Sequence, residues 1–392
     1  MSQAPVYMDN HATTRVDPRV VESMLPYFSA IYGNPGSVSH VFGAEAREAV
    51  DAARVQIAQA IGARPKEIVF TSGATESNNL AIRGIAERPR RKGNHLLSVV
   101  TEHKAVLDPL KRLQRRGYEV TLLPVSPIGM IDLQQLTDSM RDDTLLVSVM
   151  LANNEIGVIQ PLAEIGRICR ERNVPLHCDA TQAVGKLRVN VDELAVDLLS
   201  FSAHKIYGPK GVGALYLRRG GAAARLESQI DGGGQELGLR SGTLNVPGII
   251  GFAKAVELCL RELPQEAARL SGLRNRLFSA LSQDLEGCTL NGPPLSPAEL
   301  RLPGNLNMSF AYVDGEALML SMGNLAVSSG SACTSADPEP SHVLRALGIG
   351  GDLTRASLRF GLGRFNTEQD VSFAIQSVTE AVRRLRKMSS LA

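Results

Sequence analysis

Short apolar runs rich in β-forming residues recur through the first half of the chain, and patterns of helical spacing separate them. The runs are EIVF (67–70), HLLSVV (95–100), EVTLLP (119–124), TLLVSVML (144–151), VPLHCD (174–179), VDLLSFS (196–202) and VGALYL (212–217). Between runs of this kind, apolar residues fall at helical spacing, as at Ala46, Val50, Ala53 and Ile57. This alternation predicts an α/β fold in which a mostly parallel, seven-stranded sheet has helices on both faces.

The pattern changes near Val246, where two long helical patterns follow one another over 247–264 and 266–285. A stretch rich in Gly and Pro comes next, at 291–305. Strand-like segments (306–310, 326–330, 356–360) then alternate with helical ones (near 314–322, near 339–347 and from about Thr367). We therefore expect a large domain over 16–262 and a smaller α+β domain over 263–392, together with 1–15. Two domains agree with a length of 392 residues at about 150 residues per domain.

Composition excludes several classes of function. Lys and Arg number 42 against 40 Asp and Glu, so the net charge is +2. This removes the main electrostatic reason to expect a nucleic-acid or acidic-membrane partner. No apolar run approaches the roughly eighteen residues of a membrane span, and the N-terminal MSQAPVYMDNHATT lacks the features of a signal peptide. We expect a soluble, cytoplasmic protein.

The cysteines are odd in number and scattered. They are Cys169, Cys178, Cys259, Cys288 and Cys333. Without a C-x-x-C pair, they argue against a disulfide framework and a zinc ribbon, so we predict reduced thiols and no metal site. Cys169, Cys178 and Cys259 lie on apolar faces and are expected in the core, whereas the surroundings of Cys288 do not assign it.

Cys333 stands apart because small residues surround it in SSGSACTS (328–335). Such a segment gives no packing reason for a cysteine and leaves its thiol accessible. An accessible thiol in a mobile loop suits a nucleophile that approaches a bound substrate and then leaves with the product.

Chemistry-bearing residues follow three of the predicted strands. Lys205 comes just after 196–202, where burial can make its amine nucleophilic enough to bind an aldehyde cofactor. Asp179 ends 174–179 and suits the pyridinium nitrogen of pyridoxal phosphate (PLP), while Gln182 could donate to that cofactor's phenolic oxygen. His103 begins a predicted helix, where it could stack on a flat ring and move protons. Each of these residues could instead have a purely structural role, such as a solvated lysine or an N-cap aspartate. Only their combination favours a functional site.

A fourth junction, Thr71 to Thr75, joins a strand to a helix and resembles a phosphate cradle. It lacks the spacing of a nucleotide P-loop, and GPKGVG (208–213) is better read as a hairpin turn, so a cofactor phosphate is favoured over a nucleotide. The alternative is an ordinary capped helix start. His204 could donate to the phosphate, whereas the remaining histidines are expected to be structural: His11, His40, His95, His177 and His342.

Over almost its whole length the sequence resembles the cysteine desulfurases of the IscS/NifS type, which are PLP enzymes of fold type I in the class V aminotransferase family. The matching stretches are ATTRVDPRV, YGNPGSVSH, EIVFTSGATESNNLAI, TEHKAVLD, NNEIGVIQPL, DATQAVGK, FSAHKIYGPKG, RSGTLN, SSGSACTS, VLRALG and RFGLGRF. The resemblance implies that L-cysteine is converted to L-alanine and that its sulfur is held as a persulfide on Cys333. Acceptor proteins for iron–sulfur cluster assembly or tRNA thiolation would then take this sulfur.

The resemblance also implies residue roles. Lys205 would form the Schiff base with PLP, Asp179 would contact the ring nitrogen, Gln182 the phenolic oxygen, and His103 would stack on the ring and move protons. The residues implied at the phosphate are Ala74, Thr75, Ser202 and His204, with Thr243 from the second subunit of a homodimer. Arg359 would bind the substrate carboxylate with its planar fork. Asn154 would contact cofactor and substrate, and Asn34 would line the same pocket.

Some features depart from the better-known relatives and bear on partner choice. The chain ends at KMSSLA, without the extension that docks the iron–sulfur scaffold in those relatives, so the resemblance does not extend to scaffold docking. The segment 218–226 has few basic residues, and Gln235 and Leu237 replace a His and an Arg. Two alternatives stay open: a selenocysteine lyase or another PLP lyase or aminotransferase of this fold, and a non-catalytic interaction platform. The joint presence of Lys205, Asp179, His103 and Cys333 opposes the platform.

Overall fold

The computed structural model describes residues 5–89, 93–220, 225–329 and 340–388. Its larger part is built on a seven-stranded sheet of order β2-β8-β7-β6-β5-β3-β4. These strands are β2 (Ile68–Thr71), β3 (His95–Val99), β4 (Glu119–Leu123), β5 (Thr144–Ser148), β6 (Leu176–Asp179), β7 (Leu198–Ser202) and β8 (Gly213–Leu217). Only β8 runs antiparallel to its neighbours β2 and β7. The seven predicted strands and the mostly parallel sheet are therefore confirmed.

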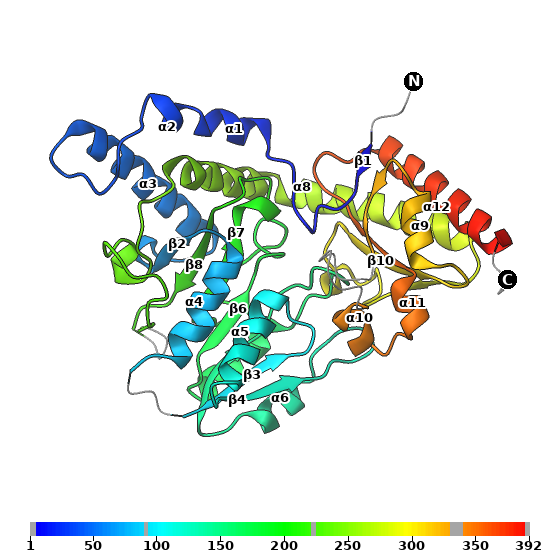
Figure 1. Ribbon diagram of the computed structural model, residues 1–392, viewed down its shortest axis with the longest axis horizontal. Coiled ribbons are helices and arrows are strands. Elements are labelled where there is room, and N and C mark those ends of the chain that lie inside the picture. The colour runs from blue at the N-terminus through cyan, green and yellow to red at the C-terminus, as the bar shows by residue number, and fades with distance from the viewer. Residues whose placement is uncertain (1–4, 90–92, 221–224, 330–339, 389–392) are drawn as a thin grey trace.

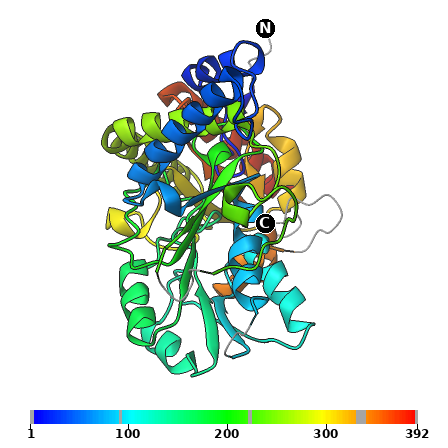
Figure 2. The same cartoon turned by 90° about the vertical axis from the view of Figure 1, so that its left-hand side faces the viewer.

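Helices cover both faces of this sheet, as Figure 2 shows from the side. They are α1 (Pro18–Met24), α2 (Pro26–Ser29), α3 (Val41–Ala60), α4 (Ala74–Ala86), α5 (Lys104–Gln114), α6 (Leu133–Ser139), α7 (Leu162–Glu171) and the start of α8 (Val246–Asp284). Successive strand residues enter different cores: Leu97 and Leu199 pack with α3, α7 and α8, whereas Leu96 and Leu198 pack with α4 and α5. Burial on both faces explains why the strands read as continuous apolar runs.

The smaller part holds an antiparallel sheet of order β12-β13-β10-β9 and a two-stranded sheet, β1-β11. Its strands are β1 (Val6–Tyr7), β9 (Cys288–Leu290), β10 (Asn305–Phe310), β11 (Leu325–Ala326), β12 (Ser328–Ser329) and β13 (Ser357–Gly361). Its helices are α9 (Gly315–Ser321), α10 (His342–Ala346), α11 (Gly351–Arg355) and α12 (Glu368–Met388). The N-terminal Val6 and Met8 belong to the core of this part, and Figure 1 shows the N-terminal segment passing between the two parts.

One prediction about the helices was wrong. The two helices expected over 247–264 and 266–285 form a single 39-residue helix, α8, which continues through Pro264. A proline removes one backbone N–H, at a cost of about 3 kcal/mol in a helix interior. Burial at both ends offsets this cost, because Phe252 packs in the core of the large sheet and Leu277 in the core of the small one. The expected domain boundary at 262/263 falls inside this helix and stays a prediction.

In the part of the chain that the structure describes, no helix is both long and apolar enough to cross a membrane.

Candidate active site

Lys205 lies in a 3-10 turn (Ala203–Lys205) directly after β7. Its Nζ donates to two carbonyl oxygens of the N-terminal segment, His11 O at 2.7 Å and Ala12 O at 2.6 Å. Burial, followed by the charge of Arg359, lowers the pKa of Lys205 to about 8, against the opposing influence of Asp9 and Asp179. A substantial fraction of this amine is therefore neutral, and so nucleophilic, near physiological pH.

Asp179 is the last residue of β6 and is 6% exposed. Its Oδ2 accepts a hydrogen bond from Asn78 Nδ2 at 2.7 Å, and its Oδ1 accepts one from Thr181 N at 3.0 Å. The segment after Asp179 forms turns before β7 and no helix, so the N-cap alternative does not apply. Asn78, on α4, is a contact that the sequence analysis missed.

Gln182 faces the N-terminal segment. Its Nε2 donates to His11 O at 2.9 Å, while its Oε1 lies 3.1 Å from His11 Nδ1 and accepts from Lys186 Nζ at 2.6 Å. Burial, with Lys186 and Arg359, lowers the pKa of His11 well below its ordinary value, so the ring is neutral. His11 was expected to be merely structural, but the structure places it against both Gln182 and Lys205.

His103 is the N-cap of α5, and its Nδ1 accepts from Ala105 N at 3.1 Å. An accepting Nδ1 leaves the ring proton on Nε2. The side chain has an exposed edge, yet desolvation by the surrounding protein lowers its pKa. The lowered pKa favours the neutral imidazole, whose proton then lies on Nε2, and this form suits ring stacking and proton transfer.

The predicted phosphate cradle lies between β2 and α4. Gly73 precedes the helix with φ 154°, a conformation that L side chains rarely adopt, and a Cβ there would stand 3.8 Å from Ser202 Oγ. The first N–H groups of a helix lack intrahelical partners, and those of α4, at Ala74 and Thr75, follow directly after this glycine beside Ser202. His204 Nδ1 lies 3.1 Å from Thr13 Oγ1, and burial lowers the pKa of His204 to about 4, so it is neutral.

Arg359, on β13, is 8% exposed and is held from three sides. Its Nη2 donates to Asp9 Oδ1 at 2.7 Å and to Ser328 Oγ at 2.8 Å, and its Nη1 donates to the carbonyl of Asn154 at 3.0 Å. Asp9 is a second contact that the sequence analysis missed. The only signal for it is its position in the motif DNHATT, which also supplies His11.

Two predicted site residues lie apart from this cluster within one chain. Asn34, on an exposed loop between α2 and α3, accepts a hydrogen bond from Gly36 N at 2.9 Å. Thr243 is exposed and follows Gly242 in the loop that precedes α8. Neither residue hydrogen-bonds to the Lys205 cluster among the residues that the structure describes. Thr243 was expected to act from a second subunit, and a single chain leaves that prediction untested.

The cysteine predictions divide in two. Cys169, Cys178 and Cys259 are buried, as predicted, and Cys288 is partly buried. Burial raises the pKa of each of these four thiols, which disfavours their thiolates. Cys333 lies outside the described residues. Within those residues, no group of His, Cys, Asp and Glu side chains could hold a metal ion.

The donor set around Lys205 fits PLP. It combines an aldehyde-reactive amine, a buried carboxylate at Asp179 for the ring nitrogen, and a helix N-terminus beside Ser202 for the phosphate. The guanidinium of Arg359, which pairs with Asp9 in this structure, adds a planar cation of the kind that suits a carboxylate. These groups can bind an amino acid and move its protons.

Comparisons with known proteins agree with this geometry. The family model "Aminotransferase class-V" matches residues 6–373. A curated relative from Anaeromyxobacter dehalogenans, cysteine desulfurase IscS, is 58% identical over 387 residues, which cover 99% of this chain and 95% of the relative. The cysteine desulfurase IscS of Salmonella schwarzengrund is 54% identical over 389 residues, with the same coverage.

Solved structures give the same picture. A NifS-like protein superposes with a TM-score of 0.89 at 39% identity, covering 97% of this chain and all of that protein. A structure described as SspA in complex with cysteine superposes with a TM-score of 0.80 at 37% identity, over 92% of this chain and 99% of that one. The similarity therefore extends through both parts of the molecule.

Proposed function

Because the chain belongs to the class V aminotransferase family, and within it to the PLP-dependent cysteine desulfurases of the IscS/NifS type, we propose that the cluster around Lys205 is its active site. The observation that carries this assignment is the Lys205 amine, whose pKa is lowered to about 8 by burial and by Arg359. The same setting makes the amine a nucleophile toward the cofactor aldehyde and a base toward the substrate.

Each neighbour of Lys205 has a part in holding the cofactor. Ala74, Thr75, Ser202 and His204 bind the phosphate, and Thr243 of a second subunit completes its shell. Asp179, fixed by Asn78, would hold the ring nitrogen protonated, Gln182 would donate to the phenolic oxygen, and His103 would pack on the ring. Bound there, PLP supplies an electron sink for the bonds at the substrate Cα.

The chain's own groups then bind L-cysteine and move its protons. Arg359 binds the α-carboxylate and Asn154 lines the same pocket, which Asn34 of a second subunit would complete. Lys205 Nζ, as the neutral amine, removes the Cα proton and returns it at a later step. His103 Nε2 carries the proton that the substrate thiol gains or loses.

We assign the sulfur transfer to Cys333. Its thiolate attacks the substrate sulfur, a sulfur–sulfur bond forms, and the carbon–sulfur bond breaks with its electron pair passing to the carbon fragment. The fragment takes up a proton and leaves as alanine, while Cys333 keeps the sulfur as a persulfide. In support, the strand β12, which precedes Cys333 along the chain, pairs with β13 so that Ser328 lies opposite Arg359.

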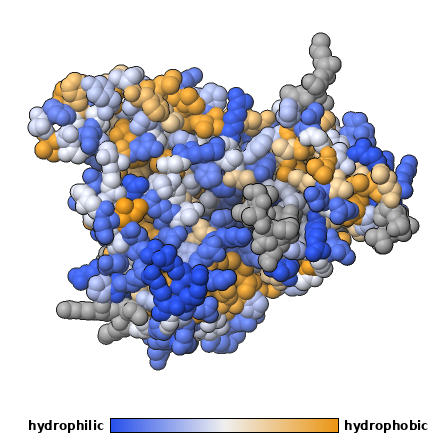
Figure 3. All heavy atoms as spheres, viewed as in Figure 1, coloured by the Kyte–Doolittle hydropathy of each residue, from blue (hydrophilic) through white to orange (hydrophobic). Residues whose placement is uncertain are grey.

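We further propose a homodimer. Large apolar side chains are exposed along α1, α2 and the start of α3, including Leu25 (57%), Phe28 (63%), Tyr32 (63%) and Val41 (61%). Figure 3 shows this apolar surface along the edge formed by α1 and α2. A contiguous apolar patch of this kind marks a protein contact, and Asn34 lies within the same stretch of chain.

The persulfide would pass to acceptor proteins of iron–sulfur cluster assembly or tRNA thiolation. We place the enzyme in the cytoplasm, where the thiols of Cys169, Cys178, Cys259 and Cys288, all unpaired in the structure, remain reduced.

Two variants test this function. Cys333→Ala should lower alanine formation from L-cysteine at least about 100-fold, because the sulfur loses its acceptor, while Cys288→Ala should leave it unchanged. Lys205→Ala should lose the visible absorbance band of the bound cofactor. Full turnover of L-cysteine by Cys333→Ala would contradict the mechanism and favour a selenocysteine lyase. A colourless wild-type protein that does not take up PLP would favour a non-catalytic platform.

A further inference from the structure

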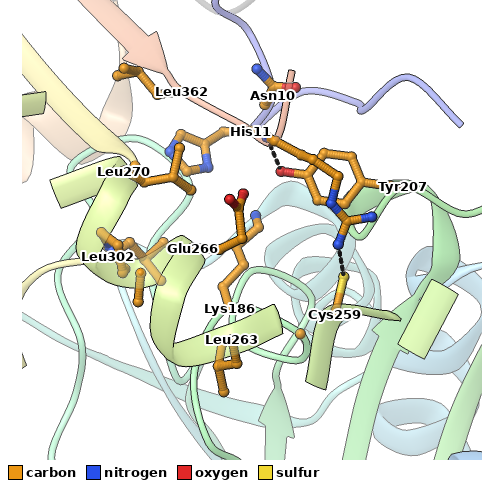
Figure 4. A pocket seen from close by; sticks show the side chains of 15 residues that line it. Asn10, His11, Lys186, Tyr207, Cys259, Leu263, Glu266, Leu270, Leu302 and Leu362 are labelled. Atoms are coloured by element: carbon orange, nitrogen blue, oxygen red, sulfur yellow. Dashed lines mark hydrogen bonds between the residues drawn. The ribbon is translucent and has the colours of Figure 1, made fainter. Parts of the chain in front are cut away.

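Lys186 is a buried cation to which neither the family resemblance nor the proposed mechanism assigns a role. It follows Gly185, whose φ is 75° and where a Cβ would stand 2.7 Å from Ile206 Cγ2. Its side chain and His11 line one pocket between the two parts of the molecule, together with Leu263 and Leu302 (Figure 4). Placing a cation among such groups is costly unless it has a specific partner.

The surroundings of Lys186 make the charge more costly still. Burial is the largest cause that lowers the pKa of Lys186 to about 7, and the charges of Lys205, after β7, and Arg359, on β13, lower this pKa as well. Cys259, on α8, acts in the opposite direction. The N-terminal segment contributes the neutral His11. Glu266, on α8, lines the same pocket, but among the described residues no ion pair joins it to Lys186. The role of this lysine therefore depends on what its amine contacts.

That contact is Gln182. In the turn after β6, main-chain hydrogen bonds run from Val184 N to Ala180 O and from Leu187 N to Ala183 O. The turn contains Gly185 at φ 75°, and within it Lys186 Nζ donates to Gln182 Oε1 at 2.6 Å. At the other end of the same carboxamide, Nε2 donates to the carbonyl of His11, the carbonyl that Lys205 also contacts.

We propose that Lys186 is a positioning residue that, together with the carbonyl of His11, fixes the Gln182 carboxamide with Nε2 toward the cofactor site as a hydrogen-bond donor. A primary amide has one oxygen and two N–H groups. With its oxygen held by Lys186 and one N–H by His11 O, the second N–H is left for an acceptor in the site. The amine on Oε1 also polarises the amide and strengthens that remaining donor.

This inference rests on the proposed function, in which Gln182 serves the phenolic oxygen of PLP. A donor there stabilises the ionised oxygen, and its loss raises the pH at which the visible spectrum of the bound cofactor changes. The spectral midpoint is thus a reading of the Gln182 hydrogen bond, and it is independent of turnover.

The experiment follows the visible spectrum of the full-length protein, loaded with PLP, as a function of pH. It compares the pH midpoint of the spectral change in the wild type with that in the variants. Lys186→Met should raise the midpoint by about half a unit to one unit, the size of one hydrogen bond. Gln182→Leu should raise it at least as much, and adding Lys186→Met to Gln182→Leu should cause no further shift. Lys254→Met is the matched control, since Lys254 pairs with Glu257 on α8, and it should leave the midpoint unchanged.

An unchanged midpoint in Lys186→Met would overturn the proposal. So would a further shift in the double variant, because Lys186 would then act directly through its charge. If Lys186→Met does not fold, Lys186→Leu also removes the donor and takes its place. An unchanged midpoint in Gln182→Leu would also overturn the proposal, because Gln182 would then have no influence on the spectrum. A wild-type protein without a visible band, or a band that persists in Lys205→Ala, would instead contradict the proposed function.

Discussion

At the scale of single residues, the site is governed by a few charges around one amine. Burial, and after it the charge of Arg359, lowers the pKa of Lys205, whereas Asp9 and Asp179 raise it. Asp9 also forms the ion pair with Arg359, at 2.7 Å. The reactivity of Lys205 therefore depends on Asp9, a carboxylate of the N-terminal segment that is distant from it in the sequence.

We predict that Asp9→Asn lowers the pKa of Lys205 below its present value of about 8, by roughly half a unit to one unit. The substitution removes one of the two carboxylates that favour the ammonium, so that Asp179 alone opposes Arg359. Since the neutral amine is the nucleophile, the rate at which the cofactor-free protein captures PLP should reach half its maximum at a lower pH.

Stopped-flow absorbance over a pH series measures this rate. Asp108→Asn, which removes an exposed carboxylate from α5, is the control and should keep the wild-type midpoint. A midpoint in Asp9→Asn that stays or rises would show that Asp9 does not act on Lys205.

At the scale of elements, the N-terminus of α1 is tied to distant segments by one buried carboxylate. Asp17 caps α1 by accepting from Arg19 N, and its Oδ2 pairs with Arg364 Nη1 at 2.7 Å. Its own N–H bonds to Tyr207 O at 2.9 Å, two residues past Lys205. Arg19 and Arg364 also reach Glu262 on α8, so this network joins α1, α8 and the segment after β13.

We predict that Asp17→Asn lowers the free energy of unfolding by about 3 kcal/mol, as expected when one partner of a buried ion pair is removed. Hydrogen bonds from Arg19, assisted by Arg364, hold the pKa of Asp17 far below its ordinary 3.8. The stabilisation is thus present above that ordinary value and is lost as pH falls below it. The gap between wild type and variant should shrink at pH 3.

Urea unfolding at pH 7 and pH 3 checks this prediction. Asp132→Asn alters the exposed N-cap of α6 and should leave the free energy of unfolding nearly unchanged, because Asn and Asp cap helices about equally well. Equal losses for the two variants at pH 7 would show that the Asp17 network adds nothing beyond an ordinary cap.

At the scale of the whole molecule, the long helix α8 contributes to both apolar cores. The N-terminal segment packs in the core of the small part and also contacts the site around Lys205, which lies at the edge of the large sheet. Val6 and Met8 pack in the small core, and the carbonyl oxygens of His11 and Ala12 accept hydrogen bonds from Lys205. The single chain leaves Asn34 and Thr243 on exposed loops. We therefore expect a second subunit to complete the site.

We predict that the double variant Phe28→Ser, Tyr32→Ser shifts the protein from dimer to monomer, because it removes two large apolar side chains from the exposed patch. The variant should also lose bound PLP during gel filtration, since Thr243 of the second subunit is withdrawn from the phosphate. Light scattering and the visible spectrum measure the two effects.

Leu320→Ser is the control, because Leu320 is 77% exposed on α9, away from this patch. A double variant that remains dimeric, or a wild-type protein that is monomeric, would contradict the dimer along α1 to α3.

Periodicity predicted the seven strands of the large sheet, because burial on both faces makes each strand a continuous apolar run. It also placed Lys205, Asp179 and His103 at strand ends, where parallel strands bring their following residues to one edge. The error at α8 arose because Pro264 is a local break signal, while the cores that carry the helix past it are tertiary.

Strand ends and motif order, then, were readable from the sequence alone, because they depend on neighbours within a few positions. The partners of those residues were not. Lys205 hydrogen-bonds to His11, which is 194 residues away in the sequence, Asp179 to Asn78, 101 residues away, and Arg359 to Asp9, 350 residues away. Such contacts leave no local period, since hydrogen bonds and ion pairs between distant segments form only after the apolar cores have packed. The tertiary structure alone decided which amine is desolvated, which carboxylate faces it and which amide is held in place.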